Sequence, residues 1–170
     1  MKEVALYMNR FAKYVVQQSR SNLTKSKKNS SKALYNSIGY KYSEDKDGFA
    51  VTFSMLDYGV FQDQGVKGAK STYTESVNSP FKYTGRFKMI PIKSLDKWAV
   101  SRNLKGIRGK DGKFISRKSL KYAIATSIYN KGIKASLFFT KPFEKAFSNL
   151  PSEVLEAYAK DLENIMNTKK

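Results

Sequence analysis

The sequence predicts an α+β fold: a small antiparallel sheet packed by long N- and C-terminal helices, with a mixed, loop-rich central insertion. Apolar residues recur at spacings of three and four near both ends of the chain, which is the period of an amphipathic helix. Between residues 37 and 55, two short segments alternate apolar and polar side chains, which is the period of a strand. The 170 residues suit one domain, 1–170, with residues 67–131 as a candidate insertion within it.

The first expected element is an N-terminal helix with a single apolar stripe. The stripe ends near Ser19 and consists of Val4, Tyr7, Met8, Phe11, Tyr14, Val15 and Gln18. Residues 20–32 are rich in serine, asparagine and lysine, so we expect a flexible basic loop there, with Leu23 as its one apolar anchor.

An antiparallel hairpin is expected next, from residues 37–42 and 49–55. The second segment alternates cleanly and places Phe49, Val51, Phe53 and Met55 on one face. The polar residues 44–48 between the two segments end in Asp47-Gly48, which favours a turn.

The central part contains short elements separated by breakers. Asp57 can cap a short helix that Gly65 ends, and residues 67–88 form a loop interrupted by Gly68, Pro80 and Gly85. Pro91 opens a helix through Ile92, Leu95, Trp98 and Ala99. Residues 106–113 have a glycine at every third position, which predicts a solvent-facing loop or an irregular hairpin tip.

Helices are expected over most of the C-terminal third. Ser116 caps a helix that ends at Gly132, with Leu120, Ala123, Ile124, Ser127 and Ile128 inward. Thr140 or Lys141 precedes a helix carrying Phe143, Ala146 and Phe147. Pro151 interrupts this helix or opens another. A last amphipathic helix carries Val154, Leu155, Tyr158, Leu162, Ile165 and Met166.

The charge and the missing residue types restrict the chemistry. The chain has 32 Lys+Arg against 14 Asp+Glu, a formal net charge of +18, and it has no histidine and no cysteine. A serine–histidine–aspartate triad, a thiolate nucleophile and a Cys/His zinc site are therefore excluded. The charge predicts an anionic partner or an assembly that compensates it.

Carboxylates are the remaining catalytic candidates, and their pattern is weak. Asp57 and Asp63 flank the expected short helix, and Glu44, Asp45 and Asp47 share one turn. This turn lacks the calcium-loop pattern and has Lys46 between its acids. The stretch 106–110 lacks the spacing of a phosphate-binding loop. We therefore expect no enzyme activity, no catalytic residue, no metal and no cofactor.

A basic cluster within residues 102–121 is the main candidate site. Its eight cationic residues are opposed only by Asp111, and they would contact a polyanion or a partner protein: Arg102, Lys105, Arg108, Lys110, Lys113, Arg117, Lys118 and Lys121. Glycine-rich backbone would let these side chains approach phosphates and release counterions. The plainer interpretation is a solvated loop in a lysine-rich protein. The tyrosines and phenylalanines could stack on bases, but most have the spacing of core residues.

The sequence also predicts where the chain resides. The N-terminal residues lack an apolar signal core, and no apolar run approaches the roughly 20 residues that span a bilayer. We therefore expect a chain that is made and kept in a cytosol, with no membrane partner.

Two segments carry a family resemblance. Residues 57–65, DYGVFQDQG, follow the hairpin, and residues 132–147, GIKASLFFTKPFEKAF, lead into the last helix. They resemble the "Tyr-Ala-x-Phe/Val-x-Glu-x-Gly" and "Gly-Ile-x-Ala-x-x-Phe-x-x-Pro-Ala/Phe" segments of the head–tail joining proteins of tailed bacteriophages, which are neck, tail-completion and minor tail proteins. The chain departs from this pattern at Gln62-Asp63-Gln64, where the family usually has a glutamate before the glycine.

The resemblance implies a structural virion protein, assembled in the host cytoplasm and located at the head–tail junction or in the tail. Subunits of this kind form a homo-oligomeric ring around the DNA channel, between the portal and neighbouring neck or tail proteins. Non-specific contact with DNA is compatible with that place. Two alternatives remain open from the residues alone: a basic nucleic-acid-binding protein, and a carboxylate-dependent hydrolase.

Overall fold

The computed structural model describes residues 2–26, 31–45, 48–84, 89–101, 104, 108–109 and 112–168, apart from the side chains of 97, 101 and 165–168. The chain is mixed helix and strand, 59% helical, with a two-stranded antiparallel sheet and long terminal helices, so the predicted fold class is confirmed. It divides into two compact units. The first unit is Met1–Gly59 with Leu137–Lys170, and the second unit is Val60–Ser136. The description of residues 1–170 as one domain with an insertion at 67–131 stays a prediction.

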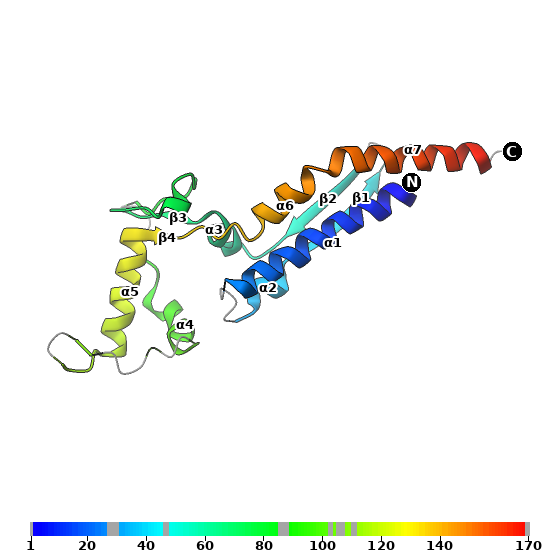
Figure 1. Ribbon diagram of the computed structural model, residues 1–170. Helices are drawn as coiled ribbons and strands as arrows, with labels where there is room; N and C mark the ends of the chain where they lie inside the picture. Colours follow the sequence, from blue (N-terminus) through cyan, green and yellow to red (C-terminus); the bar gives the residue numbers. More distant parts are fainter. Residues whose placement is uncertain are drawn as a thin grey trace. The chain divides into compact units, whose positions relative to one another are not determined.

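The first unit is a hairpin covered by long helices (Figure 1). Its elements are α1 (Lys2–Lys25), α2 (Ala33–Ser37), β1 (Gly39–Asp45), β2 (Gly48–Ser54), α6 (Thr140–Phe147) and α7 (Leu150–Thr168). In the antiparallel pairing, Gly39 lies opposite Ser54 and Tyr42 opposite Val51. Helix α1 packs against β1, α6 and α7, so segments from both ends of the chain share one core.

Helix α1 continues beyond Ser19, so the prediction of a loop at residues 20–25 was wrong. The extra turns are held by tertiary contacts: Leu23 is buried, and the Arg20 guanidinium donates to the Ile38 carbonyl at 2.8 Å. The Asn22 side-chain amide donates to the Phe138 carbonyl at 3.3 Å. These contacts outweigh the weak helix propensity of serine and asparagine in this stretch. Residues 27–30 of the expected loop lie outside the described residues.

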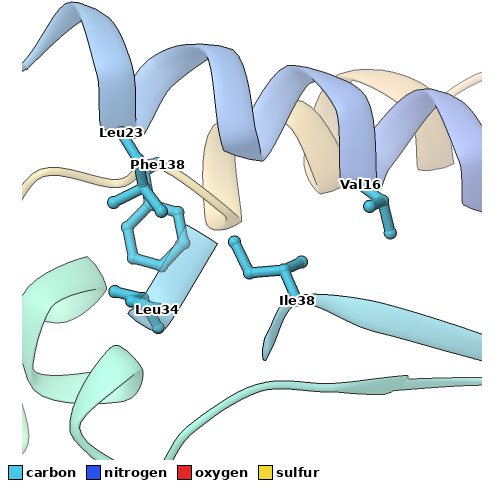
Figure 2. Close-up of a cluster of buried hydrophobic side chains, with 5 residues drawn as sticks. All are labelled: Val16, Leu23, Leu34, Ile38 and Phe138. Atoms are coloured by element: carbon cyan, nitrogen blue, oxygen red, sulfur yellow. The ribbon is translucent and has the colours of Figure 1, made fainter. Parts of the chain in front are cut away.

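Three hydrophobic clusters form the core of the first unit. The cluster in Figure 2 joins Val16 and Leu23 of α1, Leu34 of α2, Ile38, and Phe138 from the start of the C-terminal segment. The other two clusters contain Val4, Met8 and Ala157, and Phe11, Ala12 and Val15. Phe53 of β2 is half-buried and meets the rings of Phe11, Phe139 and Phe143 edge-on, with centroids 5.3–6.1 Å apart.

Helix α7 faces the core with different residues from those expected. Val154 packs on the cluster around Val4 as predicted, but Leu155, Tyr158 and Leu162 are exposed and Ala157 is buried. The side chains of Ile165 and Met166 lie outside the described residues. This orientation of α7 is set by a contact with the other end of the chain. The carboxylate of Asp161 is buried and accepts the backbone N–H groups of Glu3 and Val4, each at 3.1 Å, which fixes this face of α7 on the start of α1.

The second unit is built from short elements and one longer helix. Helix α3 (Tyr58–Gln64) begins in the first unit and ends in the second, and it is followed by β3 (Val66–Lys67), η1 (Thr74–Ser76), η2 (Ile92–Leu95), α4 (Asp96–Ser101), α5 (Arg117–Lys131) and β4 (Gly132–Ile133). Ser116 caps α5 and Gly132 ends it, as expected. The buried face of α5 differs from the expected one, because Ala123 and Ser127 are exposed and Ala125 is buried.

The second unit closes on itself where its two ends meet. Strands β3 and β4 pair antiparallel, and the Ser136 backbone N–H donates to the Asp63 carbonyl at 3.0 Å. The buried Ser76 hydroxyl donates to the Ile133 carbonyl at 2.7 Å and accepts the Ala135 N–H at 2.9 Å. We call this set of contacts, between residues 62–67 and 132–136 with Ser76, the junction.

Glycine is required at the junction because two backbone segments approach closely. A Cβ atom at Gly132, where φ is +86°, would lie 2.0 Å from the Val66 carbonyl oxygen. Real Cβ atoms do not approach backbone oxygen so closely, and a positive φ is itself costly for other residues. The strand pairing at the junction therefore depends on this glycine.

Candidate polyanion-binding surface

Positive charge is concentrated in the second unit. Residues 60–136 contain 17 Lys+Arg and 4 Asp+Glu, a net charge of +13, whereas the rest of the chain contains 15 and 10, a net charge of +5. The three hydrophobic clusters, in contrast, lie in the first unit. The second unit also buries apolar residues, among them Leu95, Ala99 and Ala125, but it carries most of the excess positive charge, so a polyanion would be attracted most strongly there.

The predicted basic cluster is partly described. Arg102, Lys105 and Lys110 lie outside the described residues. The other five are described, and four of them are exposed: Arg108, Lys113, Arg117 and Lys118. All four lie within eleven positions that run from a turn into the start of α5.

A tight backbone turn holds Arg108 close to Phe114. The two residues form an antiparallel bridge, and the Gly109 N–H donates to the Lys113 carbonyl at 2.8 Å. The Arg108 guanidinium lies 4.5 Å from the centroid of the Phe114 ring and donates to the Gly112 carbonyl at 3.2 Å. This arrangement matches the irregular hairpin tip that the glycine spacing predicts. It places a cation over an aromatic ring that remains 66% exposed.

Arg117 and Lys118 occupy the first turn of α5. The Ser116 hydroxyl accepts the Ser119 backbone N–H at 3.1 Å, which caps the helix directly before them. The N-terminal end of a helix carries partial positive charge, and acidic residues are the ones that stabilise it. This first turn has no acidic residue and two basic ones, so the positive potentials of the side chains and the helix end add together.

Lys121 is placed differently from its neighbours. Its ammonium group forms an ion pair with the Asp96 carboxylate, and its side chain is only 14% exposed. The pair links α5 to the start of α4. Its charge is compensated within the second unit, so Lys121 contributes little to the positive potential of this surface.

Two exposed aromatic residues near the cluster were not expected from the sequence. Phe114 is 66% exposed and Tyr122, in α5, is 55% exposed. Sequence reasoning assigned most aromatic residues to the core because their spacing is helical. The available signal was that Tyr122 lies outside the stripe of Leu120, Ile124 and Ile128, and that Phe114 directly follows the glycine-rich stretch.

Two carboxylates of the expected acidic turn have structural contacts within the hairpin. The Asp45 carboxylate accepts the Gly48 N–H at 3.1 Å, and Glu44 accepts the Tyr42 hydroxyl at 3.0 Å. Burial, and then this bond to Glu44, raise the pKa of the Tyr42 hydroxyl. Asp47 lies outside the described residues. Over the described ranges, no three carboxylate, histidine or cysteine side chains come together as metal ligands would.

Within the described part of the chain, no helix has the length and apolar character needed to cross a membrane. A search against protein-family models, curated proteins and solved structures finds no match to this chain.

Proposed function

We propose that this chain is a structural virion protein of a tailed bacteriophage, a ring-forming subunit of the head–tail connector, neck or tail-completion region. Its partners are further copies of itself, the portal, and neighbouring neck or tail proteins. It has no enzymatic role. It is assembled in the host cytoplasm and resides in the particle, around the channel through which DNA passes.

One observation carries this proposal. The resemblance to head–tail joining proteins rests on residues 57–65 and 132–147, which are widely separated in the sequence. In the folded chain, residues from both segments meet in the junction, where Ser136 donates hydrogen bonds to the carbonyls of Gln62 and Asp63. Direct contact between residues of two matched segments supports common ancestry better than two separate short matches would.

The distribution of charge supports the same role. The first unit holds the hydrophobic clusters, and the second unit presents exposed cations that can neutralise DNA in a channel or an acidic face of a neighbouring ring. Exposed lysines and arginines spread over a turn and a helix start suit charge neutralisation better than base reading.

A basic nucleic-acid-binding protein outside the particle is the second candidate. The observation in its favour is the same charge of the second unit, together with the exposed rings of Phe114 and Tyr122, on which bases could stack. The two candidates differ in what the chain associates with.

The test is to look for the chain in purified particles by mass spectrometry, and to measure its assembly by size-exclusion chromatography with light scattering. The head–tail proposal expects the chain in particles, and a ring of about six to twelve subunits alone or with portal or tail proteins. Absence from particles, combined with a monomer whose DNA binding falls steeply between about 50 and 200 mM salt, would establish the second candidate instead.

A variant can test whether the basic surface is needed for assembly and not for folding. Replacing Arg108, Lys113, Arg117 and Lys118 with glutamine removes four exposed charges and should change stability by less than about 0.5 kcal/mol. Particle assembly or genome retention should fall. Matched substitutions at Lys70 and Lys93, which are also exposed in the second unit, are the control. If particles of the four-residue variant assemble and infect normally, the cluster is only a solvated face.

A further inference from the structure

Helix α7 has an apolar face that the first unit does not cover. Ala157 and Asp161 are buried against α1, whereas Leu155 is 70% exposed, Leu162 45% and Tyr158 39%. These three residues are spaced by three and four, so they lie along one side of the helix. We call them the α7 stripe. The Asp161 carboxylate accepts hydrogen bonds from the first turn of α1. Residues 162–168 therefore extend beyond the start of that helix (Figure 1).

Helix α7 is also acidic within a strongly basic chain. Leu150–Thr168 contains Glu153, Glu156, Asp161 and Glu163 against Lys160 alone, a net charge of −3, whereas the whole chain carries +18. Glu156 and Glu163 are exposed and seven positions apart, so they share one line on the helix surface. The exposed side of α7 therefore combines apolar and acidic groups.

The second unit offers a surface with the opposite charge and the same apolar character. Around the start of α5, the exposed rings of Phe114 and Tyr122 accompany Arg117 and Lys118. Lys118 and Tyr122 are one helical turn apart. We call these four residues the α5 patch. It contains cations and exposed aromatic area, which are the two properties that complement acidic groups and exposed aliphatic side chains.

We propose that the α7 stripe of one copy, with Glu156 and Glu163, docks on the α5 patch of the next copy. This inference rests on the proposed ring-forming function and names the surfaces that would join its subunits. Two copies carrying +18 each repel, and a contact between an acidic and a basic surface would offset this repulsion locally. Docking would also remove both exposed apolar surfaces from water.

The two surfaces differ, so the contact is head-to-tail. Each copy presents a stripe to one neighbour and a patch to the other, and such a contact closes into a ring when its rotation allows. It also follows that reversing the charge on one surface can be compensated only by reversing it on the other.

The test uses two full-length charge-reversal variants. One carries Glu156→Lys and Glu163→Lys, and the other carries Arg117→Glu and Lys118→Glu. All four residues are exposed, and acidic groups in the first turn of α5 favour the helix, so both variants should fold. Circular dichroism and the unfolding midpoint verify this. Each variant alone should lose at least about tenfold in association constant relative to wild type, because like charges would then face each other.

An equimolar mixture of the two variants should associate again, in assemblies that contain both chains. In the mixture every stripe can meet a patch of opposite charge. Glu144→Lys and Lys93→Glu, exposed charge reversals outside both surfaces, are the controls and should associate like wild type. Leu155→Ser with Leu162→Ser should also weaken association, whereas Leu6→Ser, at an exposed leucine of α1, should not.

Several outcomes would overturn the inference. One is a charge-reversal variant that associates like wild type, and another is a mixture that fails to associate while both variants are folded. If the Arg117/Lys118 variant loses only DNA binding, the patch serves DNA and not a second copy. A wild-type chain that stays monomeric at millimolar concentration, yet is present in particles, overturns this contact and leaves the proposed virion function in place. Absence from particles overturns the virion function itself.

Discussion

Asp161 shows how one residue can determine which face of a helix is buried. Its carboxylate satisfies two N–H groups at the start of α1 that have no partner inside that helix. Burial opposes ionisation of this group, but the N–H bonds from Glu3 and Val4 favour it, and the net effect lowers the pKa of Asp161 below its ordinary value of 3.8. The ionised form is therefore favoured in the folded state.

Stability should consequently depend on the ionisation of Asp161. Because its pKa is lower in the folded state, its contribution is complete above its ordinary pKa and is lost as the pH falls through the folded value. We expect Asp161→Asn to lower the thermal unfolding midpoint at neutral pH. The difference from wild type should shrink as the pH falls below 3.8, over about pH 4 to 2. Glu144→Gln, at an exposed position of α6 outside both proposed docking surfaces, is the control. A difference that is constant over this range would contradict the assignment.

Phe138 and Phe53 differ in burial, and this difference can be measured. Phe138 is 1% exposed inside the cluster of Figure 2, whereas Phe53 is half-buried among aromatic rings. Phe138→Ala should cost about 3–5 kcal/mol of unfolding free energy, mostly through the cavity it leaves. Phe53→Ala should cost less, since less surface is buried there. Urea denaturation monitored by circular dichroism gives both values, and equal losses would contradict the difference in burial.

Sequence patterns predicted the hairpin and the longer helices, but they missed the short elements α2, β3, η1 and β4, and they predicted the buried faces of the helices less well. The hairpin was predictable because β2 alternates cleanly and Asp47-Gly48 marks a turn. The start and end of α5 were predictable because Ser116 and Gly132 are local capping signals. These features depend on neighbours in the sequence, and so they can be read from it.

The failures involve contacts between distant segments. The apolar pattern of α7 favoured Leu155 and Leu162 as inward residues, but the bond from Asp161 to the start of α1 selects another face. The extension of α1 past Ser19 depends on Leu23 and on the bond from Arg20 to Ile38. At the candidate site, the cations were predictable from composition. The exposure of Tyr122 was missed because it depends on which face of α5 is buried.

The close approach of β3 and β4 at the junction can be tested by substituting a glycine. Gly132→Ala should lower the unfolding free energy of the second unit by about 1–3 kcal/mol, because the new Cβ would overlap the Val66 carbonyl. Gly112→Ala is a matched control. Its φ is also positive, at +74°, but no atom lies within 4 Å of the added Cβ, so only the backbone cost of about 1 kcal/mol applies. Thermal unfolding of both variants gives the comparison. A Gly112 variant as unstable as the Gly132 variant would mean that close approach is unimportant.

For the whole molecule, charge repulsion should limit stability. The second unit carries a net charge of +13, and its described ion pairs are Lys121 with Asp96 and Lys134 with Glu75. At 0.1 M salt, interactions between exposed charges more than about 10 Å apart are largely screened. We expect the thermal unfolding midpoint to rise as sodium chloride increases from about 10 to 200 mM, because repulsion outweighs attraction in this chain.

The variant with glutamine at residues 108, 113, 117 and 118 provides the comparison for this effect. Because it has four fewer charges, its thermal unfolding midpoint should be higher than that of wild type at low salt. The midpoint should also rise less steeply as sodium chloride increases. A wild-type midpoint that falls with salt would show that attractive pairs dominate instead.

The junction also affects how the chain can change in evolution. Because the Ser136 N–H is bonded to the Asp63 carbonyl and β3 pairs with β4, the two segments of chain that enter and leave the second unit lie side by side. Loop closure becomes only slightly less favourable as a loop lengthens. We therefore expect the exposed turn around Gly112, outside the junction, to tolerate changes in length without separating the two ends of the second unit.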